Sequence, residues 1–119
     1  QGGGFDGCAG LDNASAVRVV PGGFVQLPSN KGHPLLEAVA NLGPVVAAVD
    51  ATDWFPYSAG IFDGCSPYAV VNHAVLIIGF GSDSAHAYFL IRNSWGQEWG
   101  EEGQIRLLRH TREGAHCGI

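Results

Sequence analysis

VNHAVLIIGFGSDSAHAYFLIRNSWGQEWG, residues Val71 to Gly100, is the stretch of sequence that decides the fold. Two apolar runs within it, Ala74 to Phe80 and Tyr88 to Ile91, are typical of strands. Between them Ser82, Asp83 and Ser84 are turn formers. The stretch therefore predicts a β-hairpin.

Two polar residues, His73 and Asn93, stand at the open end of this hairpin. A turn centred on Asp83 sets them opposite each other in an antiparallel pair. Histidine takes and returns a proton efficiently only when its tautomer and ring angle are fixed, and an Asn carbonyl accepting from one ring nitrogen fixes both. The other ring nitrogen is then free to face a nucleophile, and Trp95 is placed to shield the pair from water.

The segments NHAVLIIGFG and IRNSWGQEWGEEG, which contain His73 and Asn93, resemble the catalytic histidine and asparagine motifs of the papain family of cysteine proteases. The motifs occur in the family's order and spacing, and the resemblance covers the chain from about Cys8 onward. In that family a thiolate attacks the peptide carbonyl, the histidine shuttles the proton and the asparagine orients the histidine. The resemblance thus implies that His73 is the general base and acid, and that Asn93 orients it.

The family's nucleophile has no counterpart here. Its C-G-[SA]-C-[WY] motif lies about 130–150 residues before the histidine and asparagine, which is upstream of residue 1. Neither Cys8, Cys65 nor Cys117 sits in such a motif, and the family's oxyanion-hole glutamine lies further upstream still. Residues 1–119 are therefore expected to be the C-terminal, right-hand half of a peptidase domain. Another chain or segment would carry the cysteine.

The resemblance also implies an α+β fold, a β-rich, barrel-like half-domain of antiparallel strands with one short helix. The residues themselves support these elements. Pro34 followed by apolar residues at helical spacing predicts a helix that ends near Leu42. Val45 to Val49 is nearly continuous apolar sequence, as expected of a strand buried on both faces. Gln104 to Leu108 is a further predicted strand.

Other positions acquire expected roles from the same resemblance. Cys65 and Cys117 match cysteines that the family joins in a disulfide, whereas Cys8 matches one whose partner lies in the absent half and could link the two parts. Ala48 and Val71 align with walls of the pocket for the second residue before the scissile bond, which predicts an apolar pocket. Trp95, matching an indole over the histidine–asparagine contact, is expected to border the substrate.

Composition excludes several classes of function. A net charge of −5 with six basic residues argues against binding nucleic acid, and no apolar run approaches the roughly 20 residues that span a bilayer. Four potential metal ligands, His73, Cys65, His116 and Cys117, lack CxxC or HxxxH spacing, so no metal is expected. Nor does the proposed chemistry need an organic cofactor. His86 in the hairpin turn, and His110 and His116 near the C-terminal end, are expected to be exposed to solvent.

Asn13-Ala14-Ser15 is an N-glycosylation acceptor pattern. Together with the acidic composition and the expected disulfide, it favours a lysosomal, vacuolar or secreted protein.

One alternative of another class stays open. The chain could be a peptidase-like domain without activity, retained as a structural or binding subunit, because the same hairpin contacts also stabilise the fold. Substrate preference, endopeptidase versus exopeptidase action and the source of the other half are left open by the sequence.

Overall fold

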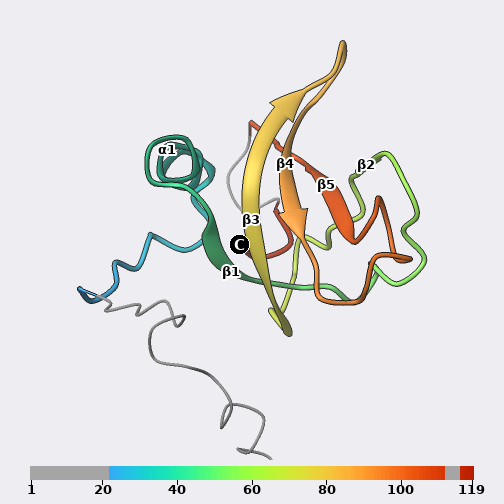
Figure 1. Cartoon of the computed structure of the whole chain (residues 1–119), viewed down its shortest axis with the longest axis horizontal. Helices are drawn as coiled ribbons and strands as arrows, with labels where there is room; N and C mark the ends of the chain where they lie inside the picture. Colours follow the sequence, from blue (N-terminus) through green and yellow to red (C-terminus); the bar gives the residue numbers. More distant parts are fainter. Residues whose placement is uncertain (1–21, 112–115) are drawn as a thin grey trace, which may run out of the picture.

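The computed structural model describes residues 22–111 and 116–119, which form one helix and a five-stranded sheet (Figure 1). Cys8 and Asn13, and with them the expected linkage and glycosylation, lie outside the described residues. The elements in chain order are α1 (Gly32–Leu42), β1 (Val45–Val49), β2 (Ile61–Phe62), β3 (His73–Ser82), β4 (Ala87–Arg92) and β5 (Gln104–Leu108).

The strands lie in the order β1-β3-β4-β5-β2. The α+β class and the single short helix are confirmed. However, the sheet is mixed, because β2 pairs with β5 in parallel while all other pairs are antiparallel. The expected barrel-like closure is wrong, because β1 and β2 stand at the two edges of the sheet and do not pair with each other.

The hairpin of β3 and β4 is confirmed, but its register differs from the expected one. The turn spans residues 83–86, where Asp83 Oδ1 accepts the N–H groups of Ala85 and His86, and a further register shift lies between Ile77 and Gly79. Leu76 consequently pairs with Arg92. His73 is therefore not directly opposite Asn93, because the turn is longer than a turn centred on Asp83 and the strands are irregular.

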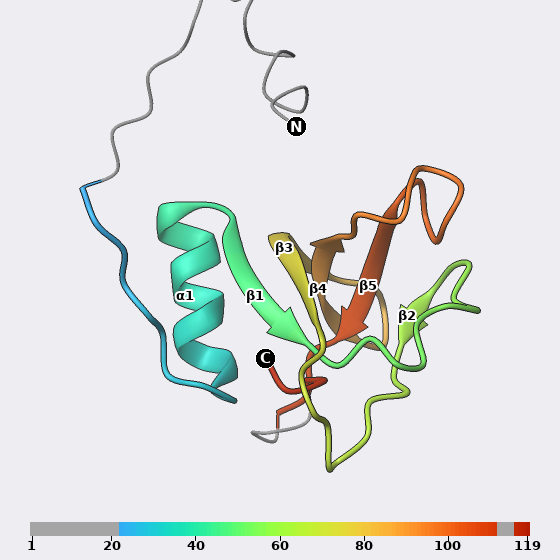
Figure 2. The ribbon, with the colours of Figure 1, turned by 90° about the horizontal axis from the view of Figure 1, so that it is seen from below.

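Helix α1 lies alongside β1 and β3 on one side of the sheet (Figure 2). Its buried residues, Leu35, Ala38 and Val39, recur at helical spacing and face the sheet. The same sheet face and the adjoining loops contribute the largest fully buried side chains, which are Trp54, Phe89, Ile77, Ile91, Ile105, Leu107, Val49 and Cys117. One core therefore forms under α1.

The opposite face of the sheet is open at β1, β3 and β4. Val46 pairs with Leu76, and Leu76 with Arg92, so that these three side chains form one row across the sheet. Val46 is 77% exposed. The expectation that Val45–Val49 is buried on both faces is therefore wrong for this chain, because α1 covers only one face and no described residue covers the other. We call the row of Val46, Leu76 and Arg92 the open face.

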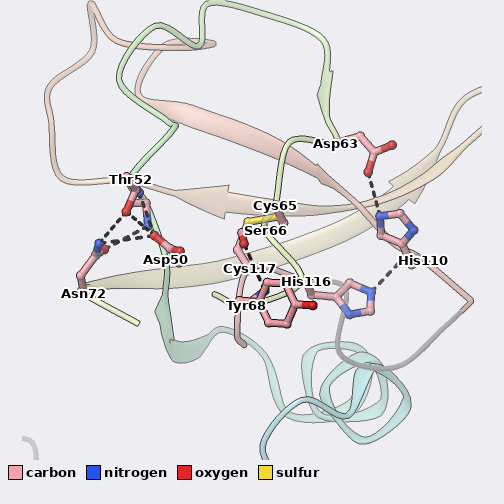
Figure 3. The surroundings of a disulfide bond; sticks show 11 residues. Asp50, Thr52, Asp63, Cys65, Ser66, Tyr68, Asn72, His110, His116 and Cys117 are labelled. Atoms are coloured by element: carbon pink, nitrogen blue, oxygen red, sulfur yellow. Dashed lines mark hydrogen bonds and ion pairs between the residues drawn. A yellow bond between two sulfur atoms is a disulfide. The ribbon is translucent and has the colours of Figure 1, made fainter. Parts of the chain in front are cut away.

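A disulfide between Cys65 and Cys117 is confirmed (Figure 3). The backbone carbonyl of Cys117 accepts the N–H of Asp50 at 2.7 Å, which brings the C-terminal segment to the end of β1. The adjacent His116 is buried and its Nε2 accepts the N–H of His110. The prediction that His116 is exposed is thus wrong, because its ring packs inside this junction. His110 is also partly buried, and its ring contacts Asp63.

No helix among the described residues is long and apolar enough to cross a membrane.

Candidate active site

His73 and Asn93 meet through their side chains at the ends of β3 and β4. His73 Nε2 lies 2.7 Å from Asn93 Oδ1. Continued by one residue beyond Arg92, the strand register sets Asn93 opposite Val75, so His73 is its diagonal neighbour. Diagonal positions on one face of a sheet are within reach of long side chains. The predicted contact is therefore confirmed, although the register behind it differs.

The hydrogen bonds around Asn93 fix the tautomer of His73. Asn93 Oδ1 also accepts the backbone N–H of Ser94 at 2.8 Å, which identifies this atom as the amide oxygen. An oxygen only accepts in this contact, so Nε2 of His73 carries the proton and donates it. Nδ1 is then an acceptor, and none of residues 22–111 and 116–119 hydrogen-bonds it. Such an imidazole can take a proton from an incoming acid at Nδ1.

The backbone of Asn93 is held by the loop that follows it. Its N–H donates to the carbonyl oxygen of Gly103 at 3.0 Å. Gly103 has a φ of 89°, and a Cβ there would lie 3.2 Å from the carbonyl oxygen of Gly96. A glycine is therefore needed for the loop to close under Asn93.

Trp95 covers the pair on one side. Its ring centroid lies 5.1 Å from that of His73, and the planes are tilted by 34°. Trp99 packs edge-on against Trp95 at 5.1 Å, and its Nε1 donates to the carbonyl oxygens of Trp54 and Phe55. Trp99 thus supports the Trp95 indole on one side. Trp95 itself stays 38% exposed, which leaves a rim that a ligand could contact.

A carboxylate network anchors the loop behind these tryptophans. Both oxygens of Glu101 accept from the Arg106 guanidinium, at 2.7 and 2.8 Å. Glu101 also accepts from Tyr57 Oη at 3.1 Å and from the N–H of Gly60 at 3.3 Å. These hydrogen bonds hold the pKa of the Glu101 carboxyl below its ordinary value, and the hydrogen bond from Arg106 has the largest effect. The network joins β5 to the segment before β2.

This network predicts a pH dependence of stability. Because the pKa of Glu101 is lower in the folded than in the unfolded chain, its contribution is present at neutral pH and is lost as the pH falls through the folded-state pKa. We expect Glu101→Gln to cost about 1 kcal/mol near neutral pH. Urea unfolding of the variant should also show a smaller loss of stability between about pH 6 and about pH 3 than the wild type.

Glu98→Gln is the matched control for this measurement. Glu98 is an exposed carboxylate in the same loop and hydrogen-bonds no described residue. Its variant should follow the wild-type pH profile. An unchanged profile for Glu101→Gln would contradict the role of the network.

The expected substrate-pocket residues lie near this site but do not enclose a cavity together. Ala48, on β1, and Val71, before β3, are both exposed. A shallow depression of about 470 Å³ is lined by other residues, namely Val46, Ala74, Val75, Leu76, Arg92, Asn93 and Ser94. It joins the open face to Asn93. The part of the chain described here therefore supplies at most one wall of a substrate pocket.

No group of three or more His, Cys, Asp or Glu side chains within the described ranges is arranged to hold a metal ion. The two described cysteines are bonded to each other, so neither is a free thiol.

Two groups of hydrogen bonds close to the site escaped the sequence reasoning. These are the Glu101 network and a group of hydrogen bonds around Asn72, which precedes His73. The position of Asn72 beside His73 was the one available signal. Its partners are 20 to 22 residues away in sequence, and no periodicity connects them.

The chain is similar in sequence to known proteins. A sequence profile of the papain family of cysteine proteases matches residues 6–119. The chain is 41% identical to cathepsin S of Mus musculus over 98 residues, which is 81% of this chain and 28% of that protein. It is 47% identical to cathepsin J of Rattus norvegicus over 116 residues, 91% of this chain and 33% of the relative.

The fold has a counterpart among solved structures. The structure of digestive procathepsin L 3 of the Tenebrio molitor larval midgut matches with a TM-score of 0.69 and 44% sequence identity. The match covers 78% of this chain and 31% of that protein. The chain thus spans about a third of the length of the proteins it resembles.

Proposed function

This chain belongs to the papain family of cysteine proteases, and from that membership we propose that it supplies the histidine and asparagine of a peptidase. The nucleophilic cysteine would lie on a part outside residues 1–119. The observation that carries the proposal is the 2.7 Å contact between His73 Nε2 and Asn93 Oδ1, which leaves Nδ1 of His73 free to accept a proton.

The proposed reaction is hydrolysis of a peptide bond through a thioester. His73 Nδ1 takes the thiol proton, and the thiolate attacks the carbonyl carbon of the substrate. When the carbon–nitrogen bond breaks, the same imidazole returns the proton to the leaving amine. Water then hydrolyses the thioester, again with His73 as base. Asn93 keeps Nε2–H in place throughout, and Trp95 limits the access of water to the contact.

The companion part is expected to cover the open face. Val46 and Leu76 need apolar partners, because exposed apolar faces of this kind mark interaction surfaces. Arg92 forms no ion pair with any described residue. Burying its charge without a partner would be costly, so the companion should bring a carboxylate or carbonyl oxygens to it. Docking there would also set the cysteine beside the depression that reaches Asn93.

Ala48, Val71 and Trp95 are the proposed substrate-contacting residues of this chain. Ala48 and Val71 would form the apolar wall of a pocket that the companion completes.

The disulfide of Cys65 with Cys117 is consistent with an oxidising compartment. We therefore propose a lysosomal, vacuolar or secreted setting, and a disulfide linkage of the companion through Cys8.

A peptide epoxide directed at cysteine tests this function. Incubated with freshly reduced protein and followed by intact mass, it should label a companion chain or segment and leave residues 1–119 unmodified. Pretreatment with a small alkylating agent should prevent the labelling. Absence of labelling with the companion present would instead favour a peptidase-like subunit without activity.

A further inference from the structure

The segment that leads into His73 is tied to the end of β1 by the side chain of Asn72. Asn72 Oδ1 accepts the backbone N–H of Ala51 at 3.0 Å. The backbone N–H of Asn72 donates to the carbonyl oxygen of Val49 at 2.9 Å. Asn72 is thus fixed at two points, to the last residue of β1 and to Ala51 just beyond it.

The other end of the Asn72 amide faces two oxygens (Figure 3). Its Nδ2 donates to Thr52 Oγ1 at 3.0 Å and lies 3.4 Å from Asp50 Oδ1. The Thr52 hydroxyl in turn donates to Asp50 Oδ1, which also accepts the N–H of Thr52. The donors therefore run from Asn72 to Thr52 to Asp50, and this order fixes which way the amide points. We call Asp50, Thr52 and Asn72 the clip.

We propose that Asn72 is a positioning residue for His73, and that Thr52 and Asp50 hold the Asn72 amide in the required orientation. The reason lies in the strand pairing. His73 pairs with Val49 of β1, but the pairing of β3 with β4 begins only at Leu76. The backbone at His73 is therefore held by one neighbouring strand, and the clip supplies the second restraint. Loosening it lets the ring move away from Asn93.

This inference rests on the proposed function for the role of His73. Its test, however, observes the imidazole ring of His73 directly and needs no nucleophile. The sample is the 119-residue chain together with any polypeptide that co-purifies with it. The measurement is the exchange of the His73 Nε2 proton with solvent, followed by proton–nitrogen NMR of the ring. In the wild type this proton is protected by its hydrogen bond to Asn93.

Asn72→Ala and Thr52→Val remove the clip at different points. Each should raise the exchange rate of the Nε2 proton about fivefold, the size expected for loss of one net hydrogen bond. Thr52→Ser keeps the hydroxyl and should restore the wild-type rate. The matched control is Ser66→Ala, because Ser66 Oγ accepts the N–H of Tyr68 in the exposed loop before Asn72 without contacting the clip. It should leave the rate unchanged.

Two results would overturn the proposal. One is an unchanged exchange rate of the Nε2 proton in Thr52→Val. Because Thr52 is exposed, this variant should fold even if Asn72→Ala does not. The other is an equal increase in Ser66→Ala, since that would make the effect a general loosening of the loop. Failure of the epoxide labelling, in contrast, would argue against the proposed peptidase function, but the exchange measurement would still test the role of Asn72.

Discussion

His73→Ala will abolish peptide hydrolysis by the assembled protein, while Asn93→Ala will leave a reduced rate. In the proposed mechanism His73 exchanges the proton through Nδ1, whereas Asn93 only holds the imidazole ring through its contact with Nε2. General acid–base catalysis contributes about 10²–10⁴-fold, and the histidine also generates the thiolate, so we expect at least that loss for His73→Ala.

The measurement is kcat and kcat/KM on a fluorogenic peptide, at matched concentrations of cysteine titrated with the epoxide. For Asn93→Ala the loss should appear mainly in kcat, because substrate contacts are retained. His86→Ala is the control, since His86 lies in the exposed hairpin turn away from the site. Equal residual rates for His73→Ala and Asn93→Ala would contradict the division of roles.

Most of the regular elements could be predicted from local sequence. Val45–Val49 and Gln104–Leu108 are strands with the expected bounds, and the helix near Pro34 begins only two residues earlier than predicted. These elements depend on periodicity and on Gly or Pro at their ends, which are properties of neighbouring residues. The meeting of His73 and Asn93 was also predictable, because a hairpin brings its two ends together whatever its detailed register.

Longer-range features could not be predicted in the same way. An apolar run such as Val45–Val49 shows that a strand can be buried, but not whether this chain contains what buries it. The position of β3 against β4 depended on a turn held by the side chain of Asp83. The burial of His116 depends on packing between residues far apart in sequence. All three features depend on contacts that no pattern of neighbouring residues specifies.

Val46→Asp will prevent the chain from assembling with its companion. Val46 is 77% exposed in the chain itself, so a carboxylate there costs little in the isolated chain. In the assembled protein the open face would be covered, and the new charge would lie buried without a partner. That penalty amounts to several kcal/mol, and each 1.4 kcal/mol weakens association about tenfold. We expect association at least about a hundredfold weaker, measured by native mass and light scattering under reducing conditions.

Val70→Asp provides a closely matched control. Val70 is 76% exposed, so the two valines differ little in accessibility, but Val70 lies in the loop before β3 and outside the open face. The same charge should leave association unchanged there. Because both variants carry the same net charge, any difference between them reports on position alone. If Val46→Asp assembles as tightly as Val70→Asp, the companion does not dock on the open face, and the nucleophile would have to reach His73 from another direction.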